Sequence, residues 1–244
     1  MLTKQKGNMY EFISHTWNPV RGRCLHMCDY CYMKKWKLGE IALHEDEFKT
    51  KLGKGNFIFI GSGTDMWAKD VPVEWIEKVL EHTRKYPESR YLFQSKNPMR
   101  FLDFLEQMPP NVVFGTTIES NRKYGVSKAP SYNQRASALG ELKEIGFETM
   151  VTIEPILDFD LNELVQLIRT ANPVWINIGA DSKGHKLPEP TPEQIEELVE
   201  KLQKETDVKL KRNIERILGA TAEDVLEKLC ESIMYKNGFR KKGK

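Results

Sequence analysis

Long hydrophobic runs are missing from this sequence of 244 residues. A helix that crosses a membrane needs roughly 18 or more consecutive apolar residues, and no segment approaches that length. The first residues, 1–9, also lack the uninterrupted apolar stretch of a signal peptide. We therefore expect a cytoplasmic protein without membrane contact.

An excess of charge of one sign is missing too. The sequence has 37 Lys and Arg against 35 Asp and Glu, a formal net charge of +2. This balance excludes a strongly basic, histone-like protein and an acidic tail protein. Positive charge gathers only locally, at residues 209–212 and 236–244. We expect these two segments to be solvated, with a contact to nucleic acid as the alternative.

Cysteine is scarce, and its distribution excludes a disulfide framework. Only four cysteines occur; Cys24, Cys28 and Cys31 fall within eight positions, while Cys230 stands alone. We expect Cys230 to be a buried, small apolar side chain. The cluster of three is the most informative feature of the sequence.

Short segments rich in β-branched and aromatic residues alternate with segments of helical periodicity. They predict six strands, at residues 12–20, 57–60, 90–93, 112–117, 149–153 and 174–178. Asp160 with Glu163, and Thr191 with Gln194, have the spacing of capping boxes and predict helix starts after the fifth and sixth strands. Repeated strand–helix units favour parallel strands with right-handed crossovers, and therefore the α/β class.

The length and the number of units favour a single-domain partial (βα)6 barrel. A closed barrel of eight units takes about 250 residues, and here the last forty or so positions read as mostly helical. We expect the barrel to occupy residues 1–210, and a helical C-terminal extension with a basic tail to occupy residues 211–244. An open doubly wound sheet is the alternative, because periodicity does not separate the two.

The three clustered cysteines follow the first predicted strand with the spacing C-x3-C-x2-C. Thiolates this close in sequence can converge on one metal centre. One interpretation is a structural zinc site completed by His26 or His44. Against it, no second cysteine or histidine pair follows at zinc-finger spacing, and an α/β chain of this size needs no metal to fold. The second interpretation is an iron–sulfur cluster that leaves one iron open to a further ligand.

The cysteine spacing, with Tyr30 as the aromatic residue before the third cysteine, resembles the signature of the radical S-adenosylmethionine superfamily. Further stretches resemble the branch that holds spore photoproduct lyase and a phage-associated group of three-cysteine proteins. They lie at residues 16–20, 63–67, 93–98, 115–119 and 152–156. The resemblance covers about residues 14 to 180. Many of the phage-associated relatives space the first two cysteines more widely, which puts a shared substrate in doubt.

This resemblance implies a [4Fe–4S] cluster on Cys24, Cys28 and Cys31 and S-adenosylmethionine as the second cofactor. For the cofactor it implies contacts from Tyr30, from Gly61, Ser62, Gly63 and Asp65 after the second strand, from Lys96 after the third, and from Glu119 and Glu154 at the ends of the fourth and fifth. The glycine-containing edge and Asp65 would meet the methionine ammonium group, and Lys96 the carboxylate. The plainer alternatives are an ordinary turn, a solvated lysine, and carboxylates that cap helices or lie in loops.

The resemblance also implies reductive cleavage of S-adenosylmethionine to a 5′-deoxyadenosyl radical, with electrons from an external donor such as flavodoxin or ferredoxin. Its substrate is open, and a nucleic-acid base, in repair or modification, is the one we favour over a small molecule or a peptide. Cys230 could then also be a hydrogen-atom donor, if the C-terminal segment folds over the site. The competing hypothesis is a zinc-bearing module that binds nucleic acid or protein without catalysis.

Overall fold

The computed structural model describes residues 1–5 and 9–236 and is built around one mixed sheet of eight strands. The order of its strands is β1-β2-β5-β6-β7-β8-β9-β10. Their bounds are β1 Thr3–Lys4, β2 His15–Trp17, β5 Phe57–Ile60, β6 Arg90–Gln94, β7 Val112–Thr117, β8 Glu148–Ile153, β9 Trp175–Ile178 and β10 Asp207–Leu210. Strand β1 is antiparallel to β2, and the strands from β2 to β10 pair in parallel. A separate small ribbon pairs β3 (Val20–Arg21) with β4 (Ala42–Leu43).

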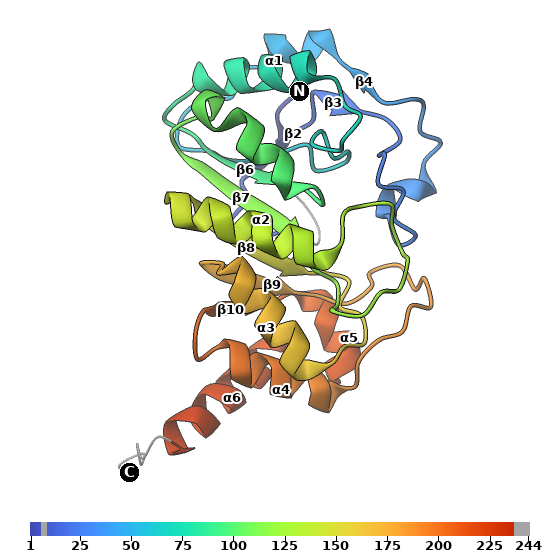
Figure 1. The fold of residues 1–244 in the computed structure, drawn as a ribbon, viewed down its shortest axis with the longest axis vertical. Coiled ribbons are helices and arrows are strands. Elements are labelled where there is room, and N and C mark those ends of the chain that lie inside the picture. Colours follow the sequence, from blue (N-terminus) through green and yellow to red (C-terminus); the bar gives the residue numbers. More distant parts are fainter. Residues whose placement is uncertain (6–8, 237–244) are drawn as a thin grey trace.

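Helices connect the parallel strands and gather on one side of the sheet (Figure 1). The α-helices are α1 Val73–Arg84, α2 Tyr132–Ile145, α3 Leu161–Ala171, α4 Pro192–Leu202, α5 Glu215–Leu218 and α6 Ala222–Lys236. The 3-10 helices are η1 Tyr32–Lys35, η2 Glu45–Lys49, η3 Pro98–Gln107 and η4 Arg212–Ile214. No described helix is long and apolar enough to cross a membrane.

Alternation along the strands divides the buried side chains into two clusters. Side chains such as Ile58, Phe93 and Val151 join the large core that also contains the helices. Their neighbours Phe59, Leu92 and Met150 belong to a second, smaller cluster. We call the sheet face that carries this second cluster the inner face. It is covered by the chain before β2, where Tyr10 and Ile13 pack against these strands and Phe12 contacts the Trp175 ring edge-on, with 5.5 Å between centroids.

The predicted α/β class and the barrel that does not close are confirmed. Strands β1 and β10 are the two edges of the sheet, and among the described residues they do not pair with each other. The structure adds a parallel strand, β10, which the sequence analysis did not predict. At the C-terminal end, α6 packs against α4 and β10. The expected basic tail at residues 236–244 lies almost wholly outside the described residues, so the division at residue 210 stays a proposal.

Only one of the two predicted capping boxes forms. At the start of α4, the Thr191 side chain accepts from the backbone of Gln194, whose side chain accepts from the Thr191 backbone. The capping box predicted at Asp160 is wrong, because the Asp160 side chain makes no capping hydrogen bond at the start of α3. The carboxylate instead accepts from Arg122 Nε at 2.9 Å, because an ion pair from a distant loop is a stronger partner than a backbone amide.

Candidate functional site

A cavity of about 540 Å³ opens at the carboxyl ends of the parallel strands. Its wall is built from the chain that follows the strands: Gly61 to Asp65 after β5, Ser95 and Lys96 after β6, Glu154 after β8, residues 180–183 after β9, and Lys211 after β10. All three clustered cysteines line it as well. Sites in parallel barrels assemble at this end, because loops from several strands converge there.

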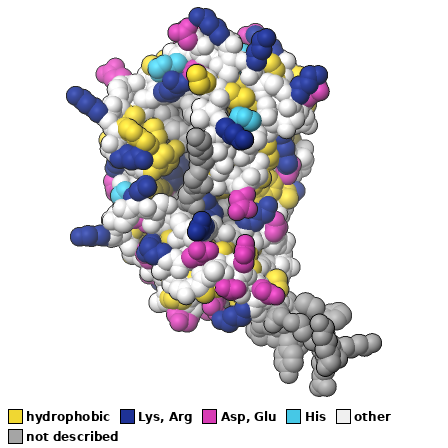
Figure 2. Space-filling model, turned by 180° about the vertical axis from the view of Figure 1, so that it is seen from behind, with side chains coloured by type: hydrophobic (Ala, Val, Ile, Leu, Met, Phe, Trp, Pro, Cys, Tyr) yellow, Lys and Arg dark blue, Asp and Glu magenta, His cyan; other side chains and the backbone are white. Residues whose placement is uncertain are grey.

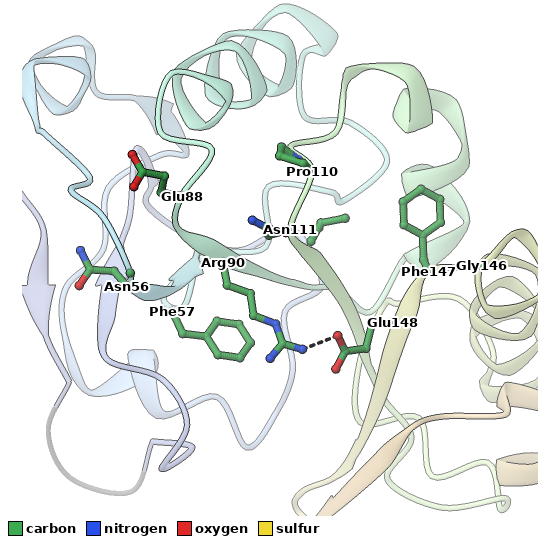
Figure 3. A pocket seen from close by; sticks show the side chains of 11 residues that line it. Asn56, Phe57, Glu88, Arg90, Pro110, Asn111, Gly146, Phe147 and Glu148 are labelled. Carbon is green, nitrogen blue, oxygen red and sulfur yellow. Dashed lines mark ion pairs between the residues drawn. The ribbon is translucent and has the colours of Figure 1, made fainter.

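A second cavity, of about 520 Å³, lies at the amino ends of the strands (Figure 3). Arg90 and Glu148, the first residues of β6 and β8, form an ion pair across it. The Arg90 guanidinium lies over the Phe57 ring, 4.6 Å from its centroid. This cavity contains none of the cysteines or other predicted site residues. We therefore place the candidate site at the carboxyl ends.

The cysteine loop is held by short backbone turns and by the segment before α2. The amide of Cys31 donates to the carbonyl of Cys28 at 3.2 Å, which starts the turn that leads into η1. The amide of Asp29 donates to Val126 O, and the amide of Lys128 to His26 O, each at 2.8 Å. The segment that contains Val126 and Lys128 therefore braces the cysteine loop.

The three cysteines are unpaired thiols that share one cavity. Burial, with a smaller contribution from the Asp65 charge, raises the pKa of Cys24 to about 12. Burial also raises the pKa of Cys28, although the nearby Lys96 ammonium group acts to lower it. Among the described residues, no three His, Cys, Asp or Glu side chains are already arranged as a metal site. The donor chemistry, three thiols on one loop without a disulfide, nevertheless fits a metal–sulfur centre.

Asp65 joins the cysteine loop to the end of β6. Its Oδ2 accepts from His26 Nε2 at 2.8 Å, and from Ser95 Oγ and the Lys96 amide at 2.9 Å each. Its Oδ1 accepts from the Trp67 amide at 2.9 Å. Burial alone would raise the pKa of Asp65, but His26 and the backbone donors outweigh it and hold the pKa below its ordinary value. The carboxylate is thus ionised and fully engaged by the protein itself.

Lys96 belongs to a buried cluster with two cations and one carboxylate. Its Nζ donates to Glu119 Oε1 at 2.5 Å and also to the Tyr30 hydroxyl, which in turn donates to Glu119. The other Glu119 oxygen accepts from Arg135 at 2.9 Å. Burial would raise the pKa of Glu119, but Lys96 and Arg135 outweigh it and lower the pKa. The cluster therefore carries one net positive charge beside Cys28.

The glycine-containing edge follows β5 and faces the cysteine loop. Gly61 has a φ of +77°, a conformation that favours glycine. Asn18 Oδ1 accepts from the Gly63 amide at 3.1 Å and from Ser62 Oγ at 3.2 Å, which fixes the turn. A Cβ on Gly63 would lie 3.3 Å from Met33 Cε, so a larger residue would press on the chain after the third cysteine.

The far wall of the cavity contains a charged group from the last strands. Glu154 accepts from Lys211 Nζ at 2.7 Å and from Asn213 Nδ2 at 2.8 Å. Lys211 also lies over the Tyr10 ring, 4.8 Å from its centroid, and the Tyr10 hydroxyl donates to Gln94 at 2.9 Å. The lysine run at residues 209–212 thus supplies a side chain to the cavity and is not simply solvated.

The structure brings together most of the residues that the sequence pointed to. The three cysteines line the cavity with Tyr30, Gly61, Ser62, Gly63, Asp65, Lys96 and Glu154. Glu119 is wholly buried and lies behind Tyr30 and Lys96, outside the lining. Cys230 is exposed on α6, so the expectation of a buried side chain is wrong, and it does not line this cavity.

Comparison with known proteins gives a family and a shared fold. The family described as "Protein of unknown function (DUF5131)" matches residues 8–209. No curated protein matches the sequence. A mutant of spore photoproduct lyase with bound AdoMet and dinucleoside spore photoproduct is 14% identical, with a TM-score of 0.58, over 75% of this chain and 61% of the lyase.

Two further structures extend this comparison. Another mutant of spore photoproduct lyase is 13% identical, with a TM-score of 0.61, over 94% of this chain and 77% of the lyase. SuiB of Streptococcus suis, bound to S-adenosylmethionine, is 9% identical, with a TM-score of 0.59, over 80% of this chain and 49% of SuiB. The resemblance to the spore photoproduct lyase branch is thereby confirmed at the level of the fold. The chain spans about three fifths of the length of the first of these lyase structures.

Proposed function

The chain belongs to the DUF5131 family, and we propose that it is a radical S-adenosylmethionine enzyme. The observation that carries the proposal is the single cavity in which three unpaired cysteines from one loop face the glycine-containing edge of β5 and the Lys96 ammonium. The fold supports it, because the chain shares that fold with structures that hold AdoMet.

Cys24, Cys28 and Cys31 would hold a [4Fe–4S] cluster. When bound, such a cluster supplies the electron that cleaves S-adenosylmethionine to methionine and a 5′-deoxyadenosyl radical, which abstracts hydrogen from a substrate. The protein keeps the ligand loop in place through Asp65 and the segment before α2. Because burial raises the pKa of Cys24 and Cys28, the metal must provide the charge that stabilises their thiolates.

Lys96 is the residue we assign to the methionine carboxylate. The described residues use two of the three N–H donors of its ammonium group, through Tyr30 and Glu119, and the side chain lines the cavity. Glu119 and Arg135 act as positioning residues, because they fix Lys96 without facing the cavity. Gly61, Ser62 and Gly63 line the cavity and would meet the ammonium group of the cofactor through their backbone.

Asp65 takes a different role from the one its sequence position suggests. Its oxygens already accept four hydrogen bonds from the protein, so we assign it to holding the loop and not to the cofactor ammonium. Glu154 lines the opposite wall, where it would face the ribose hydroxyls or the substrate.

For the substrate we propose a nucleic-acid base, with an external flavodoxin or ferredoxin as electron donor. The lyase structure contains a dinucleoside photoproduct, which supports a base; SuiB bound to its precursor peptide SuiA makes a peptide the competing class.

Metal content separates this proposal from a zinc-bearing binding module. Protein purified without oxygen should be brown and carry about four irons and four sulfides per chain. Cys28→Ser should lose most of the iron, whereas Cys230→Ser, a matched change at the exposed cysteine, should retain it. A colourless protein with one zinc per chain would contradict the proposal.

A further inference from the structure

The mouth of the cavity carries two exposed aromatic rings from the chain just after the third cysteine. Tyr32 is 43% exposed and Trp36 is 49% exposed, and both line the cavity. Their rings meet edge to face, with 6.3 Å between centroids. The Tyr32 hydroxyl donates to Ser62 O at 2.9 Å, which fixes its ring against the glycine-containing edge.

Trp36 stands apart from the other tryptophans of the protein. Trp17, Trp67 and Trp175 are buried, and Trp75 is half-buried. An indole ring left half in water at the entrance of a cavity is typical of a binding surface, because the apolar area stays available for a partner.

Positive charge surrounds these rings. Residues 21–37 contain five Lys and Arg against one Asp, a formal charge of +4 in a chain whose total is +2. The Lys35 ammonium lies 3.9 Å from the Trp36 ring centroid, and Lys183 lines the cavity from the loop after β9. On the left of Figure 2, hydrophobic side chains are bordered by Lys and Arg. We call Tyr32, Lys35, Trp36 and Lys183 the stacking rim.

Neighbouring acids neutralise only part of this charge: Arg21 pairs with Glu47, and Lys34 pairs with Asp29. On the side of Lys183, Asp181 accepts from His185 Nδ1 at 2.7 Å, and Glu154 accepts from Lys211. On the other side, Arg23 and Lys37 are exposed and form no ion pair within the described part of the chain. A partner with distributed negative charge would therefore be attracted to the rim.

We propose that the stacking rim binds single-stranded nucleic acid, with one base stacked on Trp36 and the flanking phosphates near Lys35 and Lys183. This inference rests on the proposed function, since it names the substrate class for the same cavity. Flat rings interleaved with cations match a strand whose bases are unstacked, because each base offers a π-face and each phosphate a negative charge. An acidic protein would satisfy the charge but would give no reason for paired rings at the cavity entrance.

Binding of a short oligothymidylate and a short oligouridylate, of ~12 nucleotides each, tests the proposal. Trp36→Ala should weaken binding about 5- to 150-fold, the loss that corresponds to ~1–3 kcal/mol per stacked base, while Trp36→Phe should restore most of it. Binding should also quench the tryptophan fluorescence of the parent protein, and this quenching should largely disappear in both variants, because Trp36 is its most exposed indole.

Salt dependence gives an independent measurement. For Lys35→Ala with Lys183→Ala, the slope of log affinity against log salt should fall by about 1.4, since each lost phosphate contact on a single strand removes about 0.7. The control pair is Lys54→Ala with Lys204→Ala, two exposed lysines distant from the cavity entrance in sequence and absent from its lining. Its slope should match that of the parent protein.

These assays need neither reductant nor S-adenosylmethionine, so their outcome is separate from that of the proposed chemistry. Absence of binding to either oligonucleotide at low salt would overturn the inference. Equal binding by Trp36→Ala and the parent would overturn it as well. If Trp36→Ala instead slowed reduction by flavodoxin without changing oligonucleotide affinity, the rim would be assigned to the electron donor.

Discussion

Replacement of Asp65 by Asn tests whether one buried carboxylate holds the cysteine loop against β6. In the protein its Oδ2 accepts from His26, Ser95 and the Lys96 amide, and its Oδ1 from the Trp67 amide. An Asn side chain has nearly the same size but a single acceptor oxygen, and its NH2 group would face donors. The substitution therefore removes hydrogen bonds without creating a cavity.

The magnitude follows from these contacts. At least two hydrogen bonds to the charged group are lost, and removal of one partner of a buried ion pair typically costs about 3–5 kcal/mol, so the variant should lose about 3–5 kcal/mol of stability. For a chain of this size, 1 kcal/mol corresponds to about 2–4 °C, which gives a fall in Tm of about 6–20 °C. Because His26 lies between two of the cysteines, iron content should fall at the same time.

Thermal melts followed by circular dichroism, with iron determined on the same anaerobic samples, measure both effects. Asp70→Asn is the matched control, because Asp70 is exposed five residues along the same loop. If Asp65→Asn melted within about 2 °C of the parent and kept its iron, the role assigned to Asp65 would be refuted.

Three further groups of substitutions give separate tests. Lys96→Ala should raise the Kd for S-adenosylmethionine about 10- to 150-fold, the loss of a charge-assisted hydrogen bond, with iron content unchanged; loss of iron would count against its assignment. Glu119→Gln should destabilise more than Arg135→Met in thermal melts, because it leaves two buried cations without a carboxylate. The pKa of Glu119 is lowered in the folded state, so its charge stabilises the protein above the unfolded pKa of about 4.3, and this stabilisation is lost as the pH falls through the folded pKa. In Glu119→Gln, stability should therefore fall less steeply with decreasing pH in this acidic range. Thr191→Ala should lower stability by about 1 kcal/mol, whereas Asp160→Ala should show no loss from capping. Urea titrations measure both. If Thr191→Ala lowered stability no more than a substitution at an exposed position in the middle of a helix, the capping role of Thr191 would be refuted.

Most of the fold could be predicted because its signals are local. The strands from β5 to β9 are short runs of β-branched and aromatic residues, and the structure places them within one residue of the predicted bounds. Strand β10 was missed because its four residues include Asp207 and Lys209. The Lys209 ammonium lies over the Phe12 and Trp175 rings at 5.6 Å from each centroid, a tertiary contact that no local pattern reveals.

The same distinction between local patterns and tertiary contacts applies to the residues of the candidate site. The cysteines and the glycine-containing edge form short motifs, so the sequence identifies them directly. Arg135 and Lys211 were missed, because an arginine inside a helix and a lysine in a basic run look like solvated side chains. Pairing with Glu119 and Glu154 brings them to the site across 16 and 57 positions of the sequence. The signal that could have found them is the carboxylate at each strand end, which is buried at Glu119 and partly buried at Glu154 and therefore favours a cation as partner.

Formation of 5′-deoxyadenosine is the direct readout of the proposed radical S-adenosylmethionine chemistry. Anaerobically prepared protein with its iron in place is mixed with S-adenosylmethionine and dithionite, and the nucleoside is quantified by chromatography against time. We expect the amount of 5′-deoxyadenosine to rise with iron content, no 5′-deoxyadenosine from Cys28→Ser, and undiminished formation by Cys230→Ser. An iron-loaded, reduced protein that binds S-adenosylmethionine but yields no 5′-deoxyadenosine, even with an oligonucleotide present, would contradict it.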